Sequence, residues 1–193
     1  MEITRQATDA ERLLESLGQL PEPMAKPVFI AVSGLPGTGK SYFCARLAER
    51  LLFIILESDA LRRVLFPVPD YSAEESSRLF QAVHLLIEKL LKKGLSLILD
   101  ATNLSERNRE YLYRIAERLG MKLILVRVEA PAEVVRQRLA SRLKNQESKS
   151  DADWRVYQQM KSSVEKIRCQ HFAVDTSRNI TPVLDKIVRQ ASR

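Results

Sequence analysis

Cysteine and histidine are both scarce in this chain of 193 residues, which contains two of each. Cys44 and Cys169 lie in helix-like contexts without metal-ligand spacing, so the sequence gives no sign of a zinc site, and a reduced protein is expected. His84 lies within an apolar helical pattern and His171 has no sequence partner. Neither supports a Ser–His or Cys–His nucleophile.

Long apolar runs are also missing. The longest extends from Leu51 to Leu56, the length of a strand, whereas a membrane-spanning helix needs roughly 18 or more apolar residues. The first residues, MEITRQATDAERLL, are polar and charged, unlike a secretory signal. We therefore expect a cytoplasmic protein without membrane contacts.

The composition is that of an ordinary globular domain, with 45% hydrophobic and 28% charged residues. The formal net charge is +7. A basic excess fits binding to nucleic acid, binding to anionic substrates such as ATP, or simply solvated Lys and Arg faces. Charge alone leaves these three alternatives open, and the sequence does not indicate an oligomeric state.

The chain is predicted to have two parts. Residues 4–18 form an amphipathic pattern with Leu13, Leu14 and Leu17 on one face, and the proline-rich segment LPEPMAKP follows. We therefore predict an N-terminal helix and connector over 1–26, appended to a domain over 27–193.

From Val28 onward, strand and helix patterns alternate. Apolar strands are predicted at 28–33, 52–57, 96–100, 123–128 and 171–175. Helices are predicted at 40–50, 59–66, 73–93, 105–119, 131–142, 151–168 and 181–190. This alternation predicts an α/β fold with a parallel sheet. Active sites of such sheets gather at the carboxyl ends of the strands, here at Gly34, Ser58, Ala101 and Glu129.

A complete phosphate-binding motif follows the first strand. The segment GLPGTGKS fits G-x-x-x-x-G-K-[ST], between an apolar strand and a helix, which is the context that this motif requires. Glycines allow backbone N–H groups to surround phosphates, Lys40 reaches the β- and γ-phosphates, and Ser41 is placed to ligate Mg²⁺. The predicted ATP-binding residues are Gly34, Leu35, Pro36, Gly37, Thr38, Gly39, Lys40, Ser41 and Tyr42.

Two carboxylates follow neighbouring strands. Asp100 ends the strand LILD and suits a Mg²⁺ ligand beside the P-loop, with a turn-capping Asp as the alternative. Asp59 follows the second strand and shares a helix face with Arg62. A carboxylate there can accept a hydroxyl proton, and a guanidinium can hold a phosphate. The alternative is a helix-capping Asp with a surface ion pair.

A basic helix follows the fourth strand. Arg138 and Arg142 are four residues apart, and a polar loop continues to Asp151. We predict a lid over about 136–152 that brings both arginines to the nucleotide and excludes water. A solvated basic helix is the alternative.

The segments GLPGTGKS, ESDALRR, ILDATNLSERNR, RQRLASR and SDADWRVYQQM together resemble the bacterial P-loop kinases grouped with the kinase domain of polynucleotide 5′-kinases. Chloramphenicol phosphotransferase, gluconate kinase and zeta-toxin-like kinases are more distant relatives. The resemblance extends from about Val28 to Ser177. It implies a nucleoside-monophosphate-kinase-like P-loop NTPase fold, with sheet order 2-3-1-4-5, flanking helices and a helical lid.

The resemblance also implies roles for individual residues. Asp59 matches the general base, and Arg138 and Arg142 match lid arginines on the donor phosphates, with Lys40 completing the catalytic set. Arg62 matches the arginine that grips the acceptor's phosphate. Thr102, Asn103 and Arg109 match positions near the acceptor, and Ala173–Ser177 matches the loop near adenine. The implied cofactors are ATP and Mg²⁺.

Three functions fit these observations. The first is an ATP-dependent kinase of a hydroxyl acceptor, such as a polynucleotide 5′-OH. The second is a phosphotransferase acting on a small sugar, nucleoside or antibiotic. The third is a non-catalytic ATP-binding switch or an ATPase, which Asp59 and the lid arginines disfavour. A motor ATPase more often ends this strand with Asp-Glu, whereas Ala101 follows Asp100 here.

Overall fold

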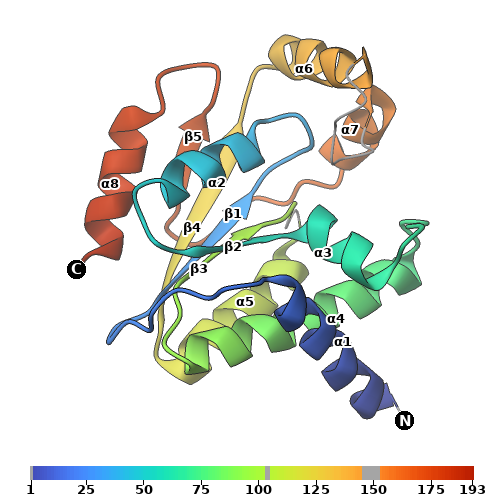
Figure 1. Ribbon diagram of the computed structural model, residues 1–193. Coiled ribbons are helices and arrows are strands. Elements are labelled where there is room, and N and C mark those ends of the chain that lie inside the picture. The colour runs from blue at the N-terminus through green and yellow to red at the C-terminus, as the bar shows by residue number, and fades with distance from the viewer. Residues whose placement is uncertain (1, 103–104, 145–152) are drawn as a thin grey trace.

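The computed structural model describes residues 2–102, 105–144 and 153–193 (Figure 1). Its centre is a five-stranded parallel sheet in the order β2-β3-β1-β4-β5. The strands are β1 (Val28–Ser33), β2 (Ile54–Glu57), β3 (Leu97–Asp100), β4 (Lys122–Glu129) and β5 (Phe172–Asp175). The predicted fold class and strand order are confirmed.

Helices cover both faces of the sheet. Figure 1 shows α2 (Lys40–Ala48) and α8 (Thr181–Ala191) on one side, and α1 (Glu2–Ser16), α4 (Ala73–Lys92) and α5 (Glu106–Leu119) on the other. Helix α3 (Ser58–Leu65) follows β2, while α6 (Ala132–Lys144) and α7 (Trp154–Lys161) lie beyond the sheet.

Strands buried on both faces explain the near-continuous apolar runs of the sequence. Every residue of β1 and β3 is buried. Phe29 and Ala31 of β1 pack into the core under α4 and α5, whereas Ile30 and Val32 pack into the core under α2 and α8. Alternate residues of one strand therefore serve two cores, one on each side of the sheet.

Local capping explains where several helices begin. The hydroxyl of Ser72 accepts a hydrogen bond from the N–H of Glu75 at the start of α4, and Ser105 does the same for Asn108 in α5. Asp153 caps α7 through the N–H of Val156. These side chains satisfy N–H groups that lack a partner within the helix.

Helix α1 is less separate than the sequence suggested. Leu13 is fully buried in the same core as the α4 and β3 residues, and Ala10 is buried beside it. The division between 1–26 and 27–193 stays a prediction, but α1 packs against α3 and α4 as part of the domain's core.

Helix α7 is shorter than the predicted helix over 151–168. It ends at Lys161, and the chain then runs without regular structure to β5. The carbonyls of Glu165 and Lys166 accept hydrogen bonds from Arg109 instead of from helical N–H groups. A buried side chain from α5 therefore holds this irregular segment in place.

The part of the chain that the structure describes contains no helix that is both long and apolar enough to cross a bilayer.

Candidate functional site

The P-loop connects β1 to α2, as predicted, and its geometry needs glycine. A Cβ on Gly34 would lie 2.4 Å from the carbonyl oxygen of Val128, too close for any side chain. Gly39, at the N-cap of α2, has φ 91°, a left-handed conformation that side chains disfavour. The loop thus turns tightly and directs the first N–H groups of α2 toward its concave side, an arrangement that suits phosphates.

Lys40 lies inside this loop. Its ammonium donates a hydrogen bond to the carbonyl of Leu35 at 3.3 Å. Burial lowers the pKa of Lys40, while the carboxylates of Asp100 and Asp59 oppose that shift. Both predicted carboxylates therefore lie close enough to act electrostatically on the P-loop lysine.

Ser41 and Asp100 contact each other directly, joining α2 to the end of β3. The Ser41 hydroxyl donates to Oδ2 of Asp100 at 2.6 Å. Asp100 is only 3% exposed, and burial raises its pKa, against the opposing influence of Lys40 and of the Ser41 hydrogen bond. A hydroxyl and a carboxylate together form an oxygen donor pair of the kind that Mg²⁺ uses beside substrate phosphates.

No group of three or more His, Cys, Asp or Glu side chains within residues 2–102, 105–144 and 153–193 is arranged to hold a metal alone.

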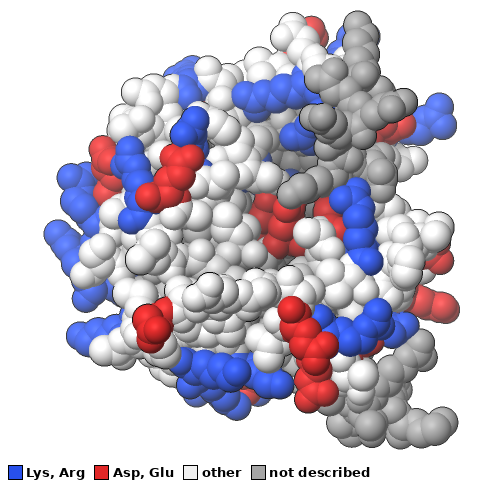
Figure 2. All heavy atoms as spheres, in the orientation of Figure 1, with Lys and Arg blue, Asp and Glu red and all other residues white. Residues whose placement is uncertain are grey.

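Asp59 lies in the first turn of α3, immediately after β2, and is half-buried. Strands β2 and β3 pair so that Glu57 lies beside Asp100 at the carboxyl edge of the sheet. The structure thus brings Asp59 to the edge where the P-loop and Asp100 meet. Figure 2 shows the molecule from the same side as Figure 1, with acidic side chains in a hollow at the middle of the face in view and basic side chains around that hollow.

Arg62, predicted to bind the acceptor, is buried and already has protein partners. Its Nη1 donates to Glu75 of α4, which is equally buried, and its Nη2 donates to the Ser76 hydroxyl at 3.2 Å. The Tyr71 ring lies over the guanidinium, 4.8 Å from ring centroid to Cζ. The buried Nε of Arg62 has no hydrogen-bond partner among the described residues.

Glu75, the partner of Arg62, was not among the site residues predicted from the sequence. It also accepts hydrogen bonds from the backbone N–H groups of Asp70 and Tyr71, at 2.8 and 3.3 Å. Tyr71 has a φ of 56°, unusual for a residue with a side chain. Glu75 therefore shapes the connection between α3 and α4 while it balances the charge of Arg62.

The two predicted lid arginines both lie near the P-loop. Arg138 donates to the Thr176 hydroxyl at 2.8 Å and to the Thr176 carbonyl at 3.0 Å. The Thr176 hydroxyl in turn donates to the carbonyl of Thr38 at 2.6 Å. Burial lowers the pKa of Lys40 and raises that of Asp100, and Arg142 is close enough for its positive charge to add to the first shift and oppose the second. Residues 145–152 of the predicted lid lie outside the described residues.

A small apolar cluster joins this region to the P-loop. Val135 and Leu139 of α6 and Tyr157 of α7 form its buried centre, and Leu35 of the P-loop packs against them. The Trp154 and Tyr157 rings are stacked with centroids 4.9 Å apart. Gly37 must be small here, since a Cβ would lie 2.8 Å from Cγ1 of Val135. Helices α6 and α7 are thereby packed onto the phosphate-binding loop.

The remaining predicted residues differ in position. Thr102 lies at the P-loop, where its carbonyl accepts hydrogen bonds from the Gly34 N–H at 3.2 Å and the Ser33 hydroxyl at 2.8 Å. Asn103 lies outside the described residues. Tyr42 is 53% exposed on α2, with Arg46 over its ring.

Arg109 is 2% exposed, and its guanidinium bonds Glu106 and the carbonyl of Glu165, at 2.7 and 3.1 Å. These protein contacts favour a structural role for Arg109 over the predicted contact with an acceptor.

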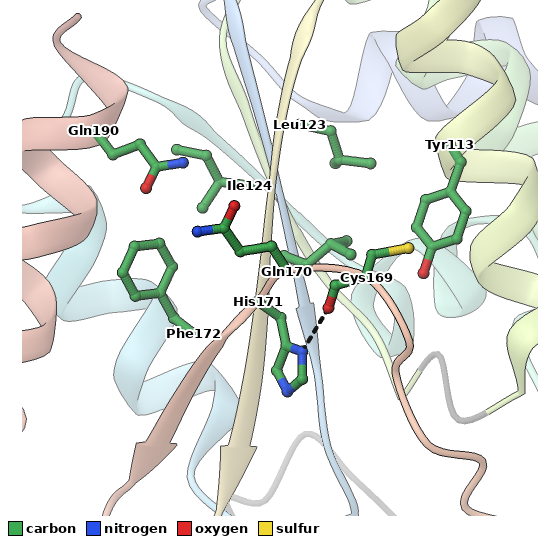
Figure 3. A pocket seen from close by; sticks show the side chains of 9 residues that line it. Tyr113, Leu123, Ile124, Cys169, Gln170, His171, Phe172 and Gln190 are labelled. Carbon is green, nitrogen blue, oxygen red and sulfur yellow. Dashed lines mark hydrogen bonds between the residues drawn. The ribbon is translucent and has the colours of Figure 1, made fainter.

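A second hollow lies at the opposite end of the sheet, where β4 and β5 begin (Figure 3). Its volume is about 280 Å³, and its lining includes Tyr113, Cys169, His171 and Gln190. His171 Nδ1 lies 2.9 Å from the Cys169 carbonyl. None of the predicted ATP-binding or catalytic residues lines this hollow.

Sequence comparisons identify relatives over the core of the domain. Residues 29–167 match the family AAA_33, described as AAA domain. The chain is 29% identical to the UPF0200 protein of Aeropyrum pernix over 139 residues, which cover 65% of this chain and 71% of that protein. It is 36% identical to the adenylate kinase isoenzyme 6 homolog of Drosophila melanogaster over 76 residues, which cover 38% of this chain and 43% of the fly protein.

Solved structures share the fold. A putative kinase from Chloroflexus aurantiacus is 24% identical with a TM-score of 0.66, over 86% of this chain and 98% of that one. Chaetomium thermophilum Kti12, solved with ADP-AlF3, is 21% identical with a TM-score of 0.67, over 84% and 98%. The Mycobacterium tuberculosis APS kinase CysC, solved with AMPPNP and APS, is 15% identical with a TM-score of 0.66, over 90% and 100%.

Sequence identities below 25% between these structures and this chain show a common fold, but they do not allow an activity to be transferred to this chain. The family match is firmer, because it spans most of the chain and includes the P-loop and the strand that ends at Asp100. The predicted P-loop kinase fold is thus confirmed, whereas the closer resemblance to polynucleotide 5′-kinases stays a prediction: the chain belongs to the AAA_33 family and has the fold of the P-loop kinases.

Proposed function

We propose that this protein is an ATP-dependent kinase that transfers the γ-phosphoryl group to a hydroxyl acceptor. One observation carries the proposal: two carboxylates lie near the P-loop. Asp100 accepts a hydrogen bond from the P-loop residue Ser41, and Asp59 is close enough to Lys40 to act on it electrostatically. A nucleotide switch needs the P-loop and a metal site. The Asp59 carboxylate, in the first turn of α3, is an additional feature, and a kinase needs such a group to accept the proton of the attacking hydroxyl.

The donor half of the site consists of the P-loop, Arg138 and Arg142. The first N–H groups of α2 and the Lys40 ammonium bind the phosphates, and the arginines stabilise charge that develops during transfer. Ser41 and Asp100 would hold Mg²⁺, which supplies charge neutralisation of the phosphate oxygens when bound. The Ser41–Asp100 hydrogen bond keeps both oxygen ligands on one side of the loop.

The acceptor half consists of Asp59 and Arg62. Asp59 takes the proton of the acceptor hydroxyl as that oxygen attacks the γ-phosphorus and the bond to the β-phosphate oxygen breaks. A polynucleotide 5′-OH is the first acceptor to test, because a guanidinium such as that of Arg62 can hold an acceptor phosphate. In that case the acceptor would share or replace the contacts that Arg62 makes with Glu75 and Ser76.

A small neutral acceptor is the second candidate, and one observation favours it. The charge of Arg62 is already balanced by Glu75 within the protein. An uncharged sugar or nucleoside would leave this buried ion pair intact, whereas an acceptor phosphate would have to compete with Glu75.

The test combines an acceptor screen with the Asp59→Asn variant. Labelled ATP is offered with 5′-OH oligonucleotides, sugars and nucleosides, and transfer is measured for the wild type and the variant. Asparagine keeps the shape of Asp59 but cannot take a proton, so transfer should fall by roughly 10²–10⁴. ATP affinity, measured by calorimetry, should change little.

Asp185→Asn, which removes a carboxylate from the distant helix α8, is the matched control and should transfer normally. Wild-type transfer by Asp59→Asn would eliminate Asp59 as the base. Loss of ATP binding in that variant would instead assign Asp59 to the metal site. A wild type that binds ATP but transfers to no acceptor would favour the switch.

A further inference from the structure

An ion pair between a buried carboxylate and a half-buried guanidinium joins helix α1 to helix α4. Asp9 is 2% exposed and accepts two hydrogen bonds from Arg78, from Nε at 2.6 Å and from Nη2 at 2.8 Å. The Arg78 guanidinium also lies over the Phe66 ring, 5.1 Å from its centroid. Phe66 is the C-cap residue of α3, so a single arginine links α1, α4 and the end of α3.

Helix α1 also contacts α3 directly. Arg12 donates a hydrogen bond to the carbonyl of Val64 at 2.9 Å, in the last turn of α3. Carbonyls of a helix's last turn have no N–H partner within the helix, and a positive charge there is favourable to the helix dipole. Leu13 of α1 belongs to the same buried core as Leu61 and Leu65 of α3. The side of α1 that carries these residues therefore fixes the C-terminal end of α3.

Residues 58–76, which we call the acceptor corner, contain both residues assigned to the acceptor half of the site. Asp59 and Arg62 are on α3, and Glu75, the partner of Arg62, is in the first turn of α4, three residues before Arg78. Helix α3 is only eight residues long. A helix this short is marginal by itself, so packing must set its position.

We propose that Asp9 and Arg12 are positioning residues for the acceptor half of the site. Through Arg78 and Val64, α1 holds α3 against α4, and so holds Asp59 and Arg62 at the edge of the sheet. The expected effect on catalysis rests on the proposed function. The effect of α1 on the position of α3 can be measured without an acceptor.

The donor half depends on other contacts. The P-loop is supported by Thr176, which follows β5, by Thr102, which follows β3, and by the apolar cluster around Val135 of α6. Breaking the contacts of α1 should therefore change how the acceptor is held, and should leave nucleotide binding unchanged. A general loss of stability would affect both halves of the site.

The experiment uses the full chain and four variants. Arg12→Ala removes the bond to Val64 from a side chain that is 46% exposed, so folding should be preserved. Arg12→Lys keeps a cation that can reach the same carbonyl and should restore normal behaviour. Asp9→Asn removes the charge that Arg78 pairs with. Glu11→Gln is the matched control, because Glu11 is on the same helix but pairs with Lys89 of α4 at 3.9 Å and is 61% exposed.

Amide hydrogen exchange is the primary measurement. Arg12→Ala and Asp9→Asn should exchange several-fold faster over 58–72, with no change over residues 34–48, which comprise the P-loop and α2, and unchanged ATP affinity by calorimetry. With the acceptor found by the screen, the transfer efficiency should fall about tenfold or more through the acceptor KM and kcat, while the ATP KM stays constant.

Unchanged exchange over 58–72 in both variants would overturn the inference, as would equal acceleration over 34–48. If hydrogen exchange over 58–72 became faster but the acceptor KM and kcat did not change, the positioning role would also be overturned. A wild type without any transfer activity contradicts the proposed function instead, and the exchange data still decide whether α1 holds the corner.

Discussion

The hydroxyl of Thr176 makes two of the contacts that connect Arg138 to the P-loop. It donates to the Thr38 carbonyl at 2.6 Å and accepts from Arg138 Nη1 at 2.8 Å, and the residue is 7% exposed. Thr176→Val replaces this hydroxyl with a methyl group of similar size. The substitution leaves the Thr38 carbonyl without this buried donor and removes one of the two bonds that Arg138 makes to residue 176.

The expected cost follows from those two losses. An unsatisfied buried carbonyl costs about 1–3 kcal/mol, and a hydrogen bond to a charged group contributes about 1.5–3 kcal/mol. Arg138 keeps its bond to the Thr176 carbonyl at 3.0 Å and is only partly buried, so its share lies at the low end. The free energy of unfolding should fall by about 2.5–4.5 kcal/mol. ATP affinity should fall about tenfold, or 1.4 kcal/mol, because Arg138 is less firmly held beside the phosphates.

Urea unfolding and calorimetric ATP titration measure the two effects separately. Thr176→Ser is the control, since serine retains the hydroxyl and should preserve ATP affinity. A Thr176→Val protein that loses less than about 0.5 kcal/mol and binds ATP like the wild type would refute the reasoning, because both hydrogen bonds would then contribute almost nothing.

Three further predictions concern other residues. Burial lowers the pKa of His84 to about 4 from its ordinary 6.5. Between these two pH values His84 is therefore protonated in the unfolded chain but neutral in the native protein. The free energy of unfolding should therefore fall by about 2 kcal/mol between pH 7 and pH 5, and His84→Gln should lack that component in denaturation curves at the two pH values. Arg109→Met should lower the melting temperature, with a loss on the order of 3 kcal/mol, yet leave the acceptor KM unchanged in the folded protein; normal stability with a raised acceptor KM would restore its predicted substrate role. Gly34→Ala should abolish ATP binding in calorimetry, because its Cβ would meet the Val128 carbonyl, whereas Gly120→Ala, where nothing lies within 4 Å, should bind ATP normally and lose only about 1 kcal/mol of stability.

Much of the fold could be predicted because local patterns determine it. The strand Val28–Ser33 was predicted with its bounds, since a fully buried strand between turn residues leaves little ambiguity. The P-loop motif located Lys40 and Ser41, and the strand-end position of Asp100 brought its carboxylate to Ser41. These predictions depend on residues next to each other in sequence, or on the rule that parallel strands end at one edge.

The remaining features depend on contacts between distant segments. Nothing in the sequence around Glu75 shows that it pairs with Arg62, because the pair forms only when α3 packs against α4. Thr176 lies 138 residues from Thr38, and its link to the P-loop is not visible in either segment. Helix α1 was predicted as an appendage, since its short leucine stripe does not reveal that Asp9 would be buried beside Arg78.

The stacked pair of Trp154 and Tyr157 has an experimental consequence. Trp154 is the single tryptophan of the chain, and it packs in the same apolar cluster as Leu35 of the P-loop. Its ring stacks on the Tyr157 ring, and the guanidinium of Arg136 lies over it, 6.0 Å from its centroid. A rearrangement of the P-loop when it binds phosphates is therefore expected to change the surroundings of the Trp154 indole, and there is no second tryptophan to mask the signal. The protein therefore contains its own fluorescent reporter, and nucleotides can be titrated by emission intensity without a dye or a labelled ligand.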